Sequence, residues 1–414
     1  MLNTFAVADG YVYVGESAGP LPSLYGIIIC LNGSNGTQLW SHSYGTSLTS
    51  IVQNGGIVYG AGFGYTLSTD VNSGFIFALN ASTGTNIWSH LGLAGTRFDY
   101  NSLVLAGANL YTLSAVYSEQ DASWHSGVYA FNANTGSQLW NYTTSGQFSS
   151  LTAAGQSVYV SSTFANTTGY INSENVSGYV YEGGVLALNA SNGTRIWNYT
   201  TNSYVQTPIV ANDTVYAVSG DGNVYAFDAS DGRIVWNYTT GSSPGSALIA
   251  SSYLSPGSAL TANNYLYVGS PTGVYCFDAS NGAAIWNFTD DTLSYSFGTY
   301  PVYADGVIYM GWNGYSSSPL NFYALDASNG QKLWNYTIGY TIQNPPLVAG
   351  NTVYIGSGYS AGPGAVIALN STITLPPPPS PSPTVPEFPS TITLAALFAA
   401  TAALAAFLKR KKPT

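Results

Sequence analysis

Ten acidic residues lie between the strand-like stretches of this 414-residue sequence. Carboxylates are the usual ligands of Ca²⁺ and attract basic partners, so these residues could bind either one. The alternative is that segments between strands simply carry whatever charge a protein has. No spacing among the acids matches an EF-hand loop. The ten are Glu16, Asp70, Asp99, Glu119, Asp121, Glu174, Glu182, Asp221, Asp290 and Asp291, alongside a single cation, Arg97.

Aromatic residues occur in the same segments and suit contact with sugars or proteins. Trp124 and Trp312 are the most informative of them, because they lie outside the regular series of tryptophans in this chain. We therefore predict a binding site of aromatic and acidic side chains. Its members are Tyr117, Trp124, Tyr179, Tyr181, Trp312, Tyr315, Glu119, Asp121, Glu174, Glu182, Asp290 and Asp291.

Other kinds of chemistry have little support in the sequence. It contains no phosphate-binding loop, nucleophile elbow or metal-ligand spacing. His42 and His90 each follow a repeated Trp by two residues and are interpreted as packed strand residues, whereas His125 is a lone His in an insertion. The net charge of −10 argues against a nucleic-acid partner. We predict no catalytic residue and no metal site.

A repeated phrase sets the positions of these candidates. It consists of a small residue, Asn or Asp, a Gly turn and a Trp, and its clearest copy is ALNASTGTNIW, from Ala78 to Trp88. Such a repeat is the sequence signature of a repeat architecture. We interpret its tryptophans as structural groups that fill the gap between neighbouring sheets. They are Trp40, Trp88, Trp140, Trp197, Trp236, Trp286 and Trp334.

Each repeat reads as four β-strands. In the copy over residues 208–240, alternating β-branched and aromatic residues form four runs separated by Asn, Asp, Ser and Gly turns. Eight such units start near residues 3, 50, 102, 149, 207, 257, 299 and 344. The eighth has no Trp strand of its own, although Ile373-Thr374-Leu375 is a candidate for that place. This pattern predicts an all-β, eight-bladed β-propeller of four-stranded antiparallel blades.

Strand order decides which turns share a face of the predicted propeller. The first-to-second and third-to-fourth turns emerge on one side and are short, and the second-to-third loops and blade links emerge on the other. All long insertions belong to the second set, so we predict that the acidic and aromatic candidates share one face. The insertions cover residues 16–25, 63–74, 117–125, 164–182 and 312–320, with a long link at 241–255.

The phrase resembles the repeat of the pyrroloquinoline-quinone-type (PQQ-like) propellers, A-x-D-x-x-T-G-x-x-x-W, in which each Trp docks against the next blade. The resemblance covers residues 1 to about 375. It implies an eight-bladed fold, in agreement with the number of units. The residues that match every specified position in the clearest copy, counting Asn for Asp, are Ala78, Asn80, Thr83, Gly84 and Trp88.

The resemblance also implies a possible function as a quinoprotein dehydrogenase. In those enzymes two adjacent cysteines and a Trp hold the quinone, and acidic residues bind calcium. This sequence departs from that pattern, because its two cysteines are far apart and no acid matches the calcium site. Cys30 and Cys276 take the small position of the phrase in different repeats, so we predict buried free thiols. We predict no cofactor, with calcium or PQQ as the alternative.

The end of the chain differs from the repeats. We predict the propeller over residues 1–375, a Pro-rich linker over 376–390, a transmembrane or sorting-signal helix over 391–408 and a basic cytoplasmic tail over 409–414. A buried core helix is the alternative for the apolar stretch. The segment VPEFP before it resembles archaeal PEF-type C-terminal sorting signals, which implies a cell-surface protein anchored through its C-terminus.

Glycosylation sequons agree with an external location. Most of them lie inside the repeated phrase, where turn and strand chemistry already favours Asn and Thr, so Asn166 and Asn175 are the better candidates. The first strand pattern follows Met1 at once with no signal peptide before it, and we expect the gene to start further upstream.

Two classes of function fit these features. We predict a non-catalytic cell-surface propeller that binds an envelope protein or glycan through its acidic, aromatic loop face, as a scaffold or an adhesin. The scaffold propeller of bacterial outer-membrane assembly shows that this fold works without a cofactor. The alternative is a PQQ-dependent dehydrogenase, or another propeller enzyme with calcium.

Overall fold

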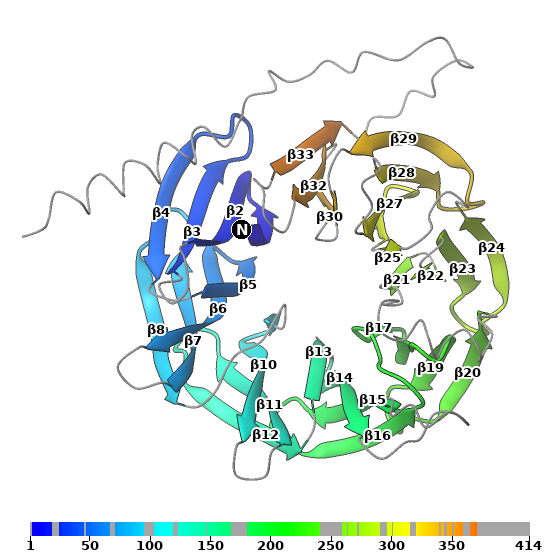
Figure 1. Cartoon of the computed structure of the whole chain (residues 1–414), viewed down its shortest axis with the longest axis horizontal. Helices are drawn as coiled ribbons and strands as arrows, with labels where there is room; N and C mark the ends of the chain where they lie inside the picture. The colour runs from blue at the N-terminus through cyan, green and yellow to red at the C-terminus, as the bar shows by residue number, and fades with distance from the viewer. Residues whose placement is uncertain are drawn as a thin grey trace, which may run out of the picture.

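The computed structural model describes most of the repeat region, and there the chain is all β. Eight sheets follow one another around a common axis, as predicted (Figure 1). Within this part of the chain no helix has the length and apolar character needed to cross a membrane. The helix predicted over 391–408 lies outside the described residues. These are 2–18, 25–44, 47–66, 71–94, 103–118, 123–145, 147–166, 180–240, 259–262, 264–270, 273–289, 296–299, 301–314, 320–338, 341–342, 346–349, 352–358 and 365–370.

Blades 1 to 4 each contain four antiparallel strands in chain order, with the first nearest the axis (Figure 1). Blade 1 contains β1 (Leu2–Ala8), β2 (Tyr11–Ala18), β3 (Tyr25–Asn32) and β4 (Gln38–Tyr44). Blade 2 contains β5 (Ser47–Asn54), β6 (Ile57–Thr66), β7 (Val71–Asn80) and β8 (Asn86–Ala94). Blade 3 contains β9 (Val104–Ala106), β10 (Asn109–Ser118), β11 (Ser123–Asn132) and β12 (Gln138–Ser145). Blade 4 contains β13 (Gln147–Ala154), β14 (Ser157–Asn166), β15 (Val180–Asn189) and β16 (Arg195–Thr201).

Blades 5 and 6 repeat this plan, whereas blades 7 and 8 have an interrupted inner strand. Blade 5 contains β17 (Ile209–Ala211), β18 (Thr214–Val218), β19 (Asn223–Asp228) and β20 (Ile234–Thr239). Blade 6 contains β21 (Ala259–Ala262), β22 (Tyr265–Ser270), β23 (Gly273–Asp278) and β24 (Ala284–Thr289). Blade 7 contains β25 (Ser296–Thr299), β26 (Val302–Ala304), β27 (Val307–Gly314), β28 (Leu320–Asp326) and β29 (Lys332–Ile338). Blade 8 contains β30 (Thr341–Ile342), β31 (Leu347–Ala349), β32 (Thr352–Gly358) and β33 (Ala365–Asn370).

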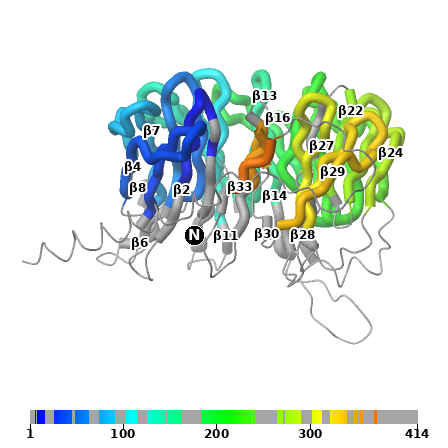
Figure 2. The backbone as a smooth tube through the Cα atoms, turned by 90° about the horizontal axis from the view of Figure 1, so that it is seen from above, coloured from blue at the N-terminus to red at the C-terminus, as the bar shows by residue number. Residues whose placement is uncertain are grey.

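The ring closes between the two ends of the repeat region. Strand β31 of blade 8 contacts β1 of blade 1, in the same way that inner strands meet elsewhere around the axis. Figure 2 shows the ring edge-on, with the blades side by side. Apolar side chains of adjacent blades form shared clusters, such as the one that joins Ile28 and Cys30 to Phe75 and Phe77. The core is therefore a series of interfaces between blades.

The two short turns of each blade lie on the same face, as the strand order predicts. The amide of Gly33, after β3, donates to the carbonyl oxygen of Gly10, after β1, at 2.8 Å. Equivalent bonds join the two turns in blades 2 to 7. The opposite face holds the second-to-third turns and the blade links, because the amide of Gly220 donates to the link residue Tyr204 at 2.9 Å.

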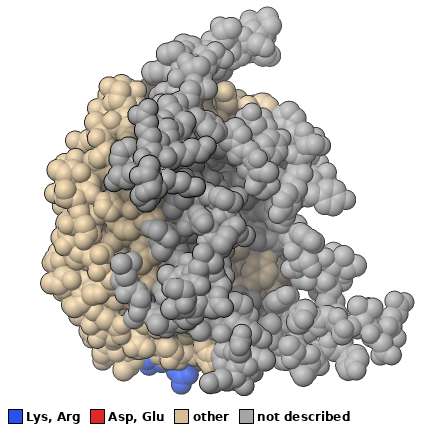
Figure 3. Space-filling view, turned by 60° about the vertical axis from the view of Figure 1, so that its left-hand side comes forward, with Lys and Arg blue, Asp and Glu red and all other residues tan. Residues whose placement is uncertain are grey.

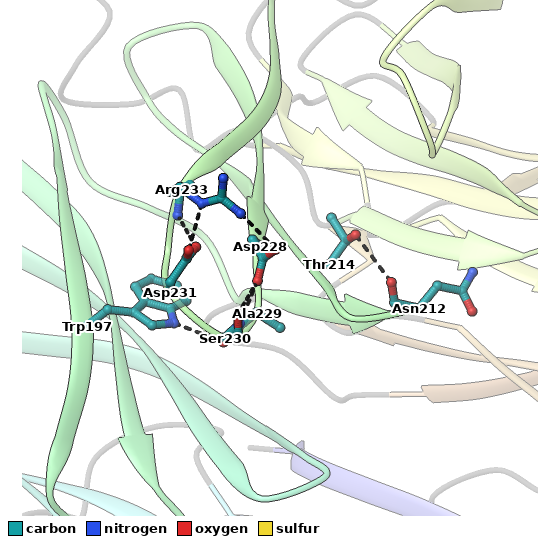
Figure 4. A network of polar contacts seen from close by, with 8 residues as sticks. All are labelled: Trp197, Asn212, Thr214, Asp228, Ala229, Ser230, Asp231 and Arg233. Atoms are coloured by element: carbon teal, nitrogen blue, oxygen red, sulfur yellow. Dashed lines mark hydrogen bonds and ion pairs between the residues drawn. The ribbon is translucent and has the colours of Figure 1, made fainter.

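Six of the seven repeated tryptophans dock on the following blade through the same bond. Trp197 Nε1 donates to the carbonyl oxygen of Ala229 at 2.9 Å (Figure 4). Its ring lies against Gly232, where an added Cβ atom would come within 2.6 Å of the indole. The turn that would receive Trp334 lies outside the described residues. The other bonded pairs are Trp40–Ala81, Trp88–Ala133, Trp140–Ala190, Trp236–Ala279 and Trp286–Ala327.

A Tyr on the second strand reaches the same carbonyl group. Tyr216 donates to Ala279 at 2.9 Å beside Trp236, and four more blades repeat this bond. Across the blade, Tyr216 pairs with Ala226, which pairs with Trp236. The small residue between Tyr and Trp is fully buried in all seven blades that have a Trp strand. These residues, each 0% exposed, are Cys30, Ala78, Ala130, Ala187, Ala226, Cys276 and Ala324.

An Asn or Asp side chain holds the turn before each Trp strand. In blade 5, Asp228 Oδ1 accepts bonds from the hydroxyl of Ser230 at 2.6 Å and from its amide at 2.9 Å (Figure 4). These bonds, with the hydroxyl first, favour the ionised carboxylate and lower the pKa of Asp228 below its ordinary value. The pKa values of Asp278 and Asp326 are lowered for the same reason. Blades 1 to 4 use Asn in this place, which does not titrate.

We expect Ser230→Ala to raise the pKa of Asp228 toward 3.8, its ordinary value, because it removes the hydroxyl donor. A lowered folded-state pKa means that this turn stabilises the fold above the unfolded-state pKa and loses that effect as pH falls through the folded-state pKa. NMR titration of the Asp228 carboxyl carbon measures the change. Ser191→Ala, beside the uncharged Asn189, is the matched control. An unchanged pKa in the Ser230 variant would contradict this role of the hydroxyl.

Candidate functional site

Three neighbouring hairpins extend beyond the blades on the face opposite the short turns, here called the long-hairpin face. Strands β6, β10 and β14 have 10 residues each, whereas β18 has 5. All four begin two residues before their inter-blade Tyr, so the extra length lies at the far end. At about 3.3 Å per residue, five further residues lengthen a hairpin by roughly 16 Å. Among the described residues, the strands of blades 2 to 4 therefore extend furthest on this face.

The predicted insertions begin and end as continued strand, which corrects their interpretation as loops. The β10–β11 ladder runs on to Ser118 opposite Ser123, leaving four residues between the strands. His125, predicted to lie in an insertion, is in β11 opposite Val116. Backbone groups that leave the blade still need hydrogen-bond partners, and a continued ladder supplies them.

The register brings two predicted aromatic positions together. Tyr117 in β10 lies directly opposite Trp124 in β11. In the next blade, Tyr181 and Glu182 lie in β15, opposite Ala165 and Phe164 of β14. Four predicted site residues thus occupy the extended parts of two adjacent hairpins, on the face predicted for them.

Other predicted site residues lie away from these two hairpins or outside the described residues. Trp312 lies in β27 opposite Thr299, and blade 7 is across the ring from blade 3 (Figure 1). The two informative tryptophans therefore belong to opposite sides of the ring, and one compact site cannot contain both. Asn166 ends β14. The remaining predicted positions lie outside the described residues: Tyr179, Tyr315, Glu119, Asp121, Glu174, Asn175, Asp290 and Asp291.

Asp221, one of the ten acids, is a structural group at the junction of blades 4 and 5. Its Oδ1 accepts bonds from the amide and side chain of Asn223 at 3.0 and 3.1 Å. Its Oδ2 accepts bonds from the amide of Asn202 at 3.3 Å and the hydroxyl of Tyr225 at 3.1 Å. Burial, and then the charge of Asp221, raise the pKa of Tyr225, so the phenol stays protonated and donates. Both carboxylate oxygens are engaged in holding the link.

This network was not predicted, although the Gly-Asp-Gly turn at residues 220–222 signals it. A side-chain acceptor beside glycines in a turn commonly bonds the local backbone. Among the described residues, no group of three or more His, Cys, Asp or Glu side chains could hold a metal ion. Where Figure 3 draws the described surface, it is almost wholly uncharged, with basic side chains at one edge.

Hydroxyl groups of the two innermost strands of blade 4 bond one another and the link to blade 5. Ser149 and Ser150 both bond the hydroxyl of Ser161, at 2.9 and 2.5 Å. Ser149 also donates to the carbonyl oxygen of Val205, in the link to blade 5, at 3.4 Å. These bonds fix neighbouring blades against each other. No base is bonded to the three hydroxyls in this described part of the chain, so they do not form a nucleophile with its activating partner.

The two cysteines are buried free thiols, as predicted. Burial raises the pKa of Cys30 to about 11 and that of Cys276 to about 12. Both thiols therefore stay protonated at neutral pH, and a protonated thiol is a poor nucleophile and metal ligand. Of the histidines, His42 is half-buried in β4, while His90 in β8 is exposed with its ring against Phe131. The prediction of packing is confirmed for His42 and only partly for His90.

The fold and its docking tryptophans define a PQQ-like-repeat β-propeller. A family model described as "Outer membrane protein assembly factor BamB" matches residues 125–289 and 271–373. Because these matches span more than half of the chain, the protein belongs to this family. Comparison with curated protein sequences gives no match.

Solved structures of similar fold come from proteins with different roles. The computationally designed Ika8 protein has a TM-score of 0.61 at 13% identity, over 89% of this chain and 96% of that one. BamB from Moraxella catarrhalis has a TM-score of 0.56 at 16% identity, over 86% and 93%. Quinohemoprotein alcohol dehydrogenase from Comamonas testosteroni has a TM-score of 0.59 at 12% identity, over 87% and 70%. At such identities the likeness establishes the fold alone.

Proposed function

We propose that this protein is a non-catalytic binding propeller of the cell envelope, which holds a protein or glycan partner on its long-hairpin face. The observation that carries the proposal is the set of three extended hairpins on blades 2 to 4, with Tyr117 opposite Trp124 on the middle one. Aromatic residues on a rigid β scaffold lose little conformational entropy on binding, which suits recognition. Function in rigid folds concentrates in such variable segments.

Family membership supports an envelope protein as the partner. The matching family model is named for an outer membrane protein assembly factor. By extension, we propose that the present protein organises or recruits another envelope component. The apolar segment over 391–408 would hold the propeller outside an archaeal membrane, with residues 409–414 inside. Asn166 and Asn175 would then be accessible to glycosylation.

A quinoprotein dehydrogenase is the alternative raised by the resemblance. The residues of this chain do not fit the quinone site of that class, because Cys30 and Cys276 lie in blades 1 and 6. Both are fully buried between neighbouring strands. They cannot form the ring of adjacent cysteines that holds the quinone in those enzymes. The described acids also include no cluster that could bind calcium.

Trp124→Ala and Trp312→Ala should each change the free energy of unfolding by no more than about 1 kcal/mol, because contact residues outside the blade interfaces contribute little to stability. Denaturant titration of each variant measures the effect. Trp236→Ala, at a blade interface, is the comparison. A loss as large as that of Trp236→Ala would place the substituted residue in the core and, for Trp124, remove it from the proposed site.

Capture from envelope extract tests the proposed function. The full-length chain, immobilised through an added tag, should retain a specific protein or glycan that the variant Tyr117→Ala/Trp124→Ala loses. Leu139→Ala, which truncates an exposed side chain on the outer strand β12, is the matched control and should retain the same partner. Identical capture by all three chains would contradict a binding role for the long-hairpin face.

A further inference from the structure

The exposed large apolar side chains of the described residues all lie on the outermost strands of the blades. These strands form the outside of the ring (Figure 1). Six of these side chains directly precede a docking Trp, and each is 42–53% exposed. Blades 1 to 6 thus carry one of them at the same place, and the six are here called the apolar rim. They are Leu39, Ile87, Leu139, Ile196, Val235 and Ile285.

Asn and Thr side chains share the outward side of these strands in five blades. Successive side chains of a strand alternate between its two sides, so residues two and four places after the apolar one point the same way. In blade 4 these are Asn198 and Thr200, which are both exposed, whereas Trp197 is buried. They form an Asn-x-Thr sequon with both ends at the surface. Blades 3, 5, 6 and 7 have the same exposed sequon at residues 141–143, 237–239, 287–289 and 335–337.

These strand sequons differ from the sequons of the turns in the state of their Asn side chain. In the turns the Asn oxygen accepts a bond from the hydroxyl of its own sequon, as from Ser191 to Asn189 at 2.6 Å. Four strand sequons have an Asn side chain with no hydrogen bond to another described residue, and an exposed, unbonded amide is accessible to an enzyme. The letters Asn-x-Thr alone do not separate the two kinds. The four are Asn198, Asn237, Asn287 and Asn335.

The apolar rim gives these sequons a physical role. Only 6% of the residues are charged, against about 25% in an average soluble protein, so charge contributes little to keeping the surface in water. Exposed apolar surface then favours association. An N-linked glycan is bulky, hydrated and solubilising. Attached to Asn198, it would begin about 7 Å along the strand from Ile196, on the same side.

We propose that five outer-strand Asn residues are acceptor sites for N-linked glycans, which cover the neighbouring apolar side chains. The inference rests on the proposed function in one respect, because the native protein meets the sugar donor only if the propeller is exported. It extends that function with a modified surface, separate from the long-hairpin face. The sites are Asn141, Asn198, Asn237, Asn287 and Asn335.

The transfer uses a phosphate-activated sugar. The donor is an oligosaccharide joined through phosphate to a lipid carrier, and an oligosaccharyltransferase of the host catalyses the step. The Asn amide nitrogen forms a bond to C1 of the first sugar and loses one proton. The bond from C1 to the phosphate oxygen breaks, and the lipid phosphate leaves with the bonding electron pair.

Blades 1 and 2 do not have the strand sequon. Ser41 and Ser89, both exposed, stand where the other blades have Asn. Leu39 and Ile87 therefore remain uncovered, and this sector of the ring stays open to contact with another macromolecule. The same difference supplies a test, because Ser41→Asn/Ser43→Thr would complete a sequon at an equivalent exposed position.

Site-resolved glycopeptide mass spectrometry tests the five sites on the full-length protein. The protein is exported through an added signal peptide in an archaeal host that N-glycosylates its surface proteins. We expect a glycan on each of the five Asn residues. Thr200→Val should lose the glycan of Asn198, because it removes the sequon hydroxyl with little change of shape, and the control Thr200→Ser should keep it.

A gain-of-site variant tests the position itself. Ser41→Asn/Ser43→Thr should acquire a glycan on blade 1, whereas the control Ser41→Gln/Ser43→Thr, which completes no sequon, should not. Replacing all five Asn residues by Gln should also increase the fluorescence of a hydrophobic dye, because the apolar rim is then uncovered. Circular dichroism of this variant must match the wild type, so that a lost fold is not mistaken for an uncovered rim.

Two results would overturn the acceptor sites: five unmodified Asn residues in the exported protein, or no gain by Ser41→Asn/Ser43→Thr. Unchanged dye fluorescence would overturn the covering role. The added signal peptide makes these results independent of where the native protein resides. Capture from envelope extract tests the proposed function separately, so the two can fail independently.

Discussion

Trp236→Ala should lower the free energy of unfolding by about 3–5 kcal/mol, the range for removing a large aromatic side chain from a core. Trp236 is 8% exposed and packs in the cluster that joins blades 5 and 6. Its Nε1 donates to Ala279, beside the hydroxyl of Tyr216. The substitution therefore leaves a cavity between two blades and takes one of two donors from a buried carbonyl group.

Urea titration followed by circular dichroism measures this loss. Val235→Ala is the control, since Val235 precedes Trp236 on the same strand and is 53% exposed. It should cost no more than about 0.5 kcal/mol. Trp236→Phe should fall between the two, because it keeps an aromatic ring but removes the N–H donor. Equal losses for the Val and Trp variants would contradict the docking role of the series.

Gly282→Ala should destabilise the protein by about 2–5 kcal/mol through two separate effects. Gly282 has a φ of 74°, and a left-handed conformation costs a residue with a Cβ atom about 1–2 kcal/mol. The added Cβ would also lie 2.6 Å from the ring of Trp236, so the indole must move out of its place. Overpacking of this kind costs a further 1–3 kcal/mol or so.

Gly306→Ala separates the two effects. Gly306 has a φ of 80°, but nothing lies within 4 Å of an added Cβ atom. This control should show the backbone cost alone. In the double variant Trp236→Ala/Gly282→Ala the steric cost disappears, so its loss should be smaller than the sum of the two single losses. Additive losses would show that the Gly and the Trp do not depend on each other.

The fold could be predicted from the sequence because its determinants are local and repeated. Each repeated position of the unit has one local role. In blade 2, Ala78 is buried between two strands and Asn80 bonds the turn. Gly84 then takes the left-handed conformation, and Trp88 docks on the next blade. A pattern repeated seven times identifies such roles without an alignment. The docking bond of the second-strand Tyr could not be predicted, because Tyr is frequent in this chain. Its hydroxyl bonds a turn in the next blade, which the sequence does not place beside it.

The candidate site could be predicted only in part. Placing Tyr117 and Trp124 on the long-hairpin face required strand order alone, and their pairing required the register of an extended hairpin. Sequence position could not show that Trp312 lies across the ring, because that depends on the closure of eight blades. Nor could it show that Asp221 is fully bonded, because its partner Asn202 lies in the preceding blade link.

The fourth strand of blade 8 was predicted only in part. The sequence predicts an eighth unit without a Trp strand, and that strand is missing among the described residues. What the sequence alone could not show is that Ala368 is exposed, unlike the equivalent small residues of the other blades.

Calorimetric titration of the purified full-length protein with PQQ and calcium distinguishes a surface-binding propeller from a quinoprotein. If the repeated phrase serves the architecture alone and function lies in binding at the surface, we expect no saturable binding of the quinone at micromolar concentration, with or without calcium. Saturable one-to-one binding in that range would contradict the account and make the protein a quinoprotein.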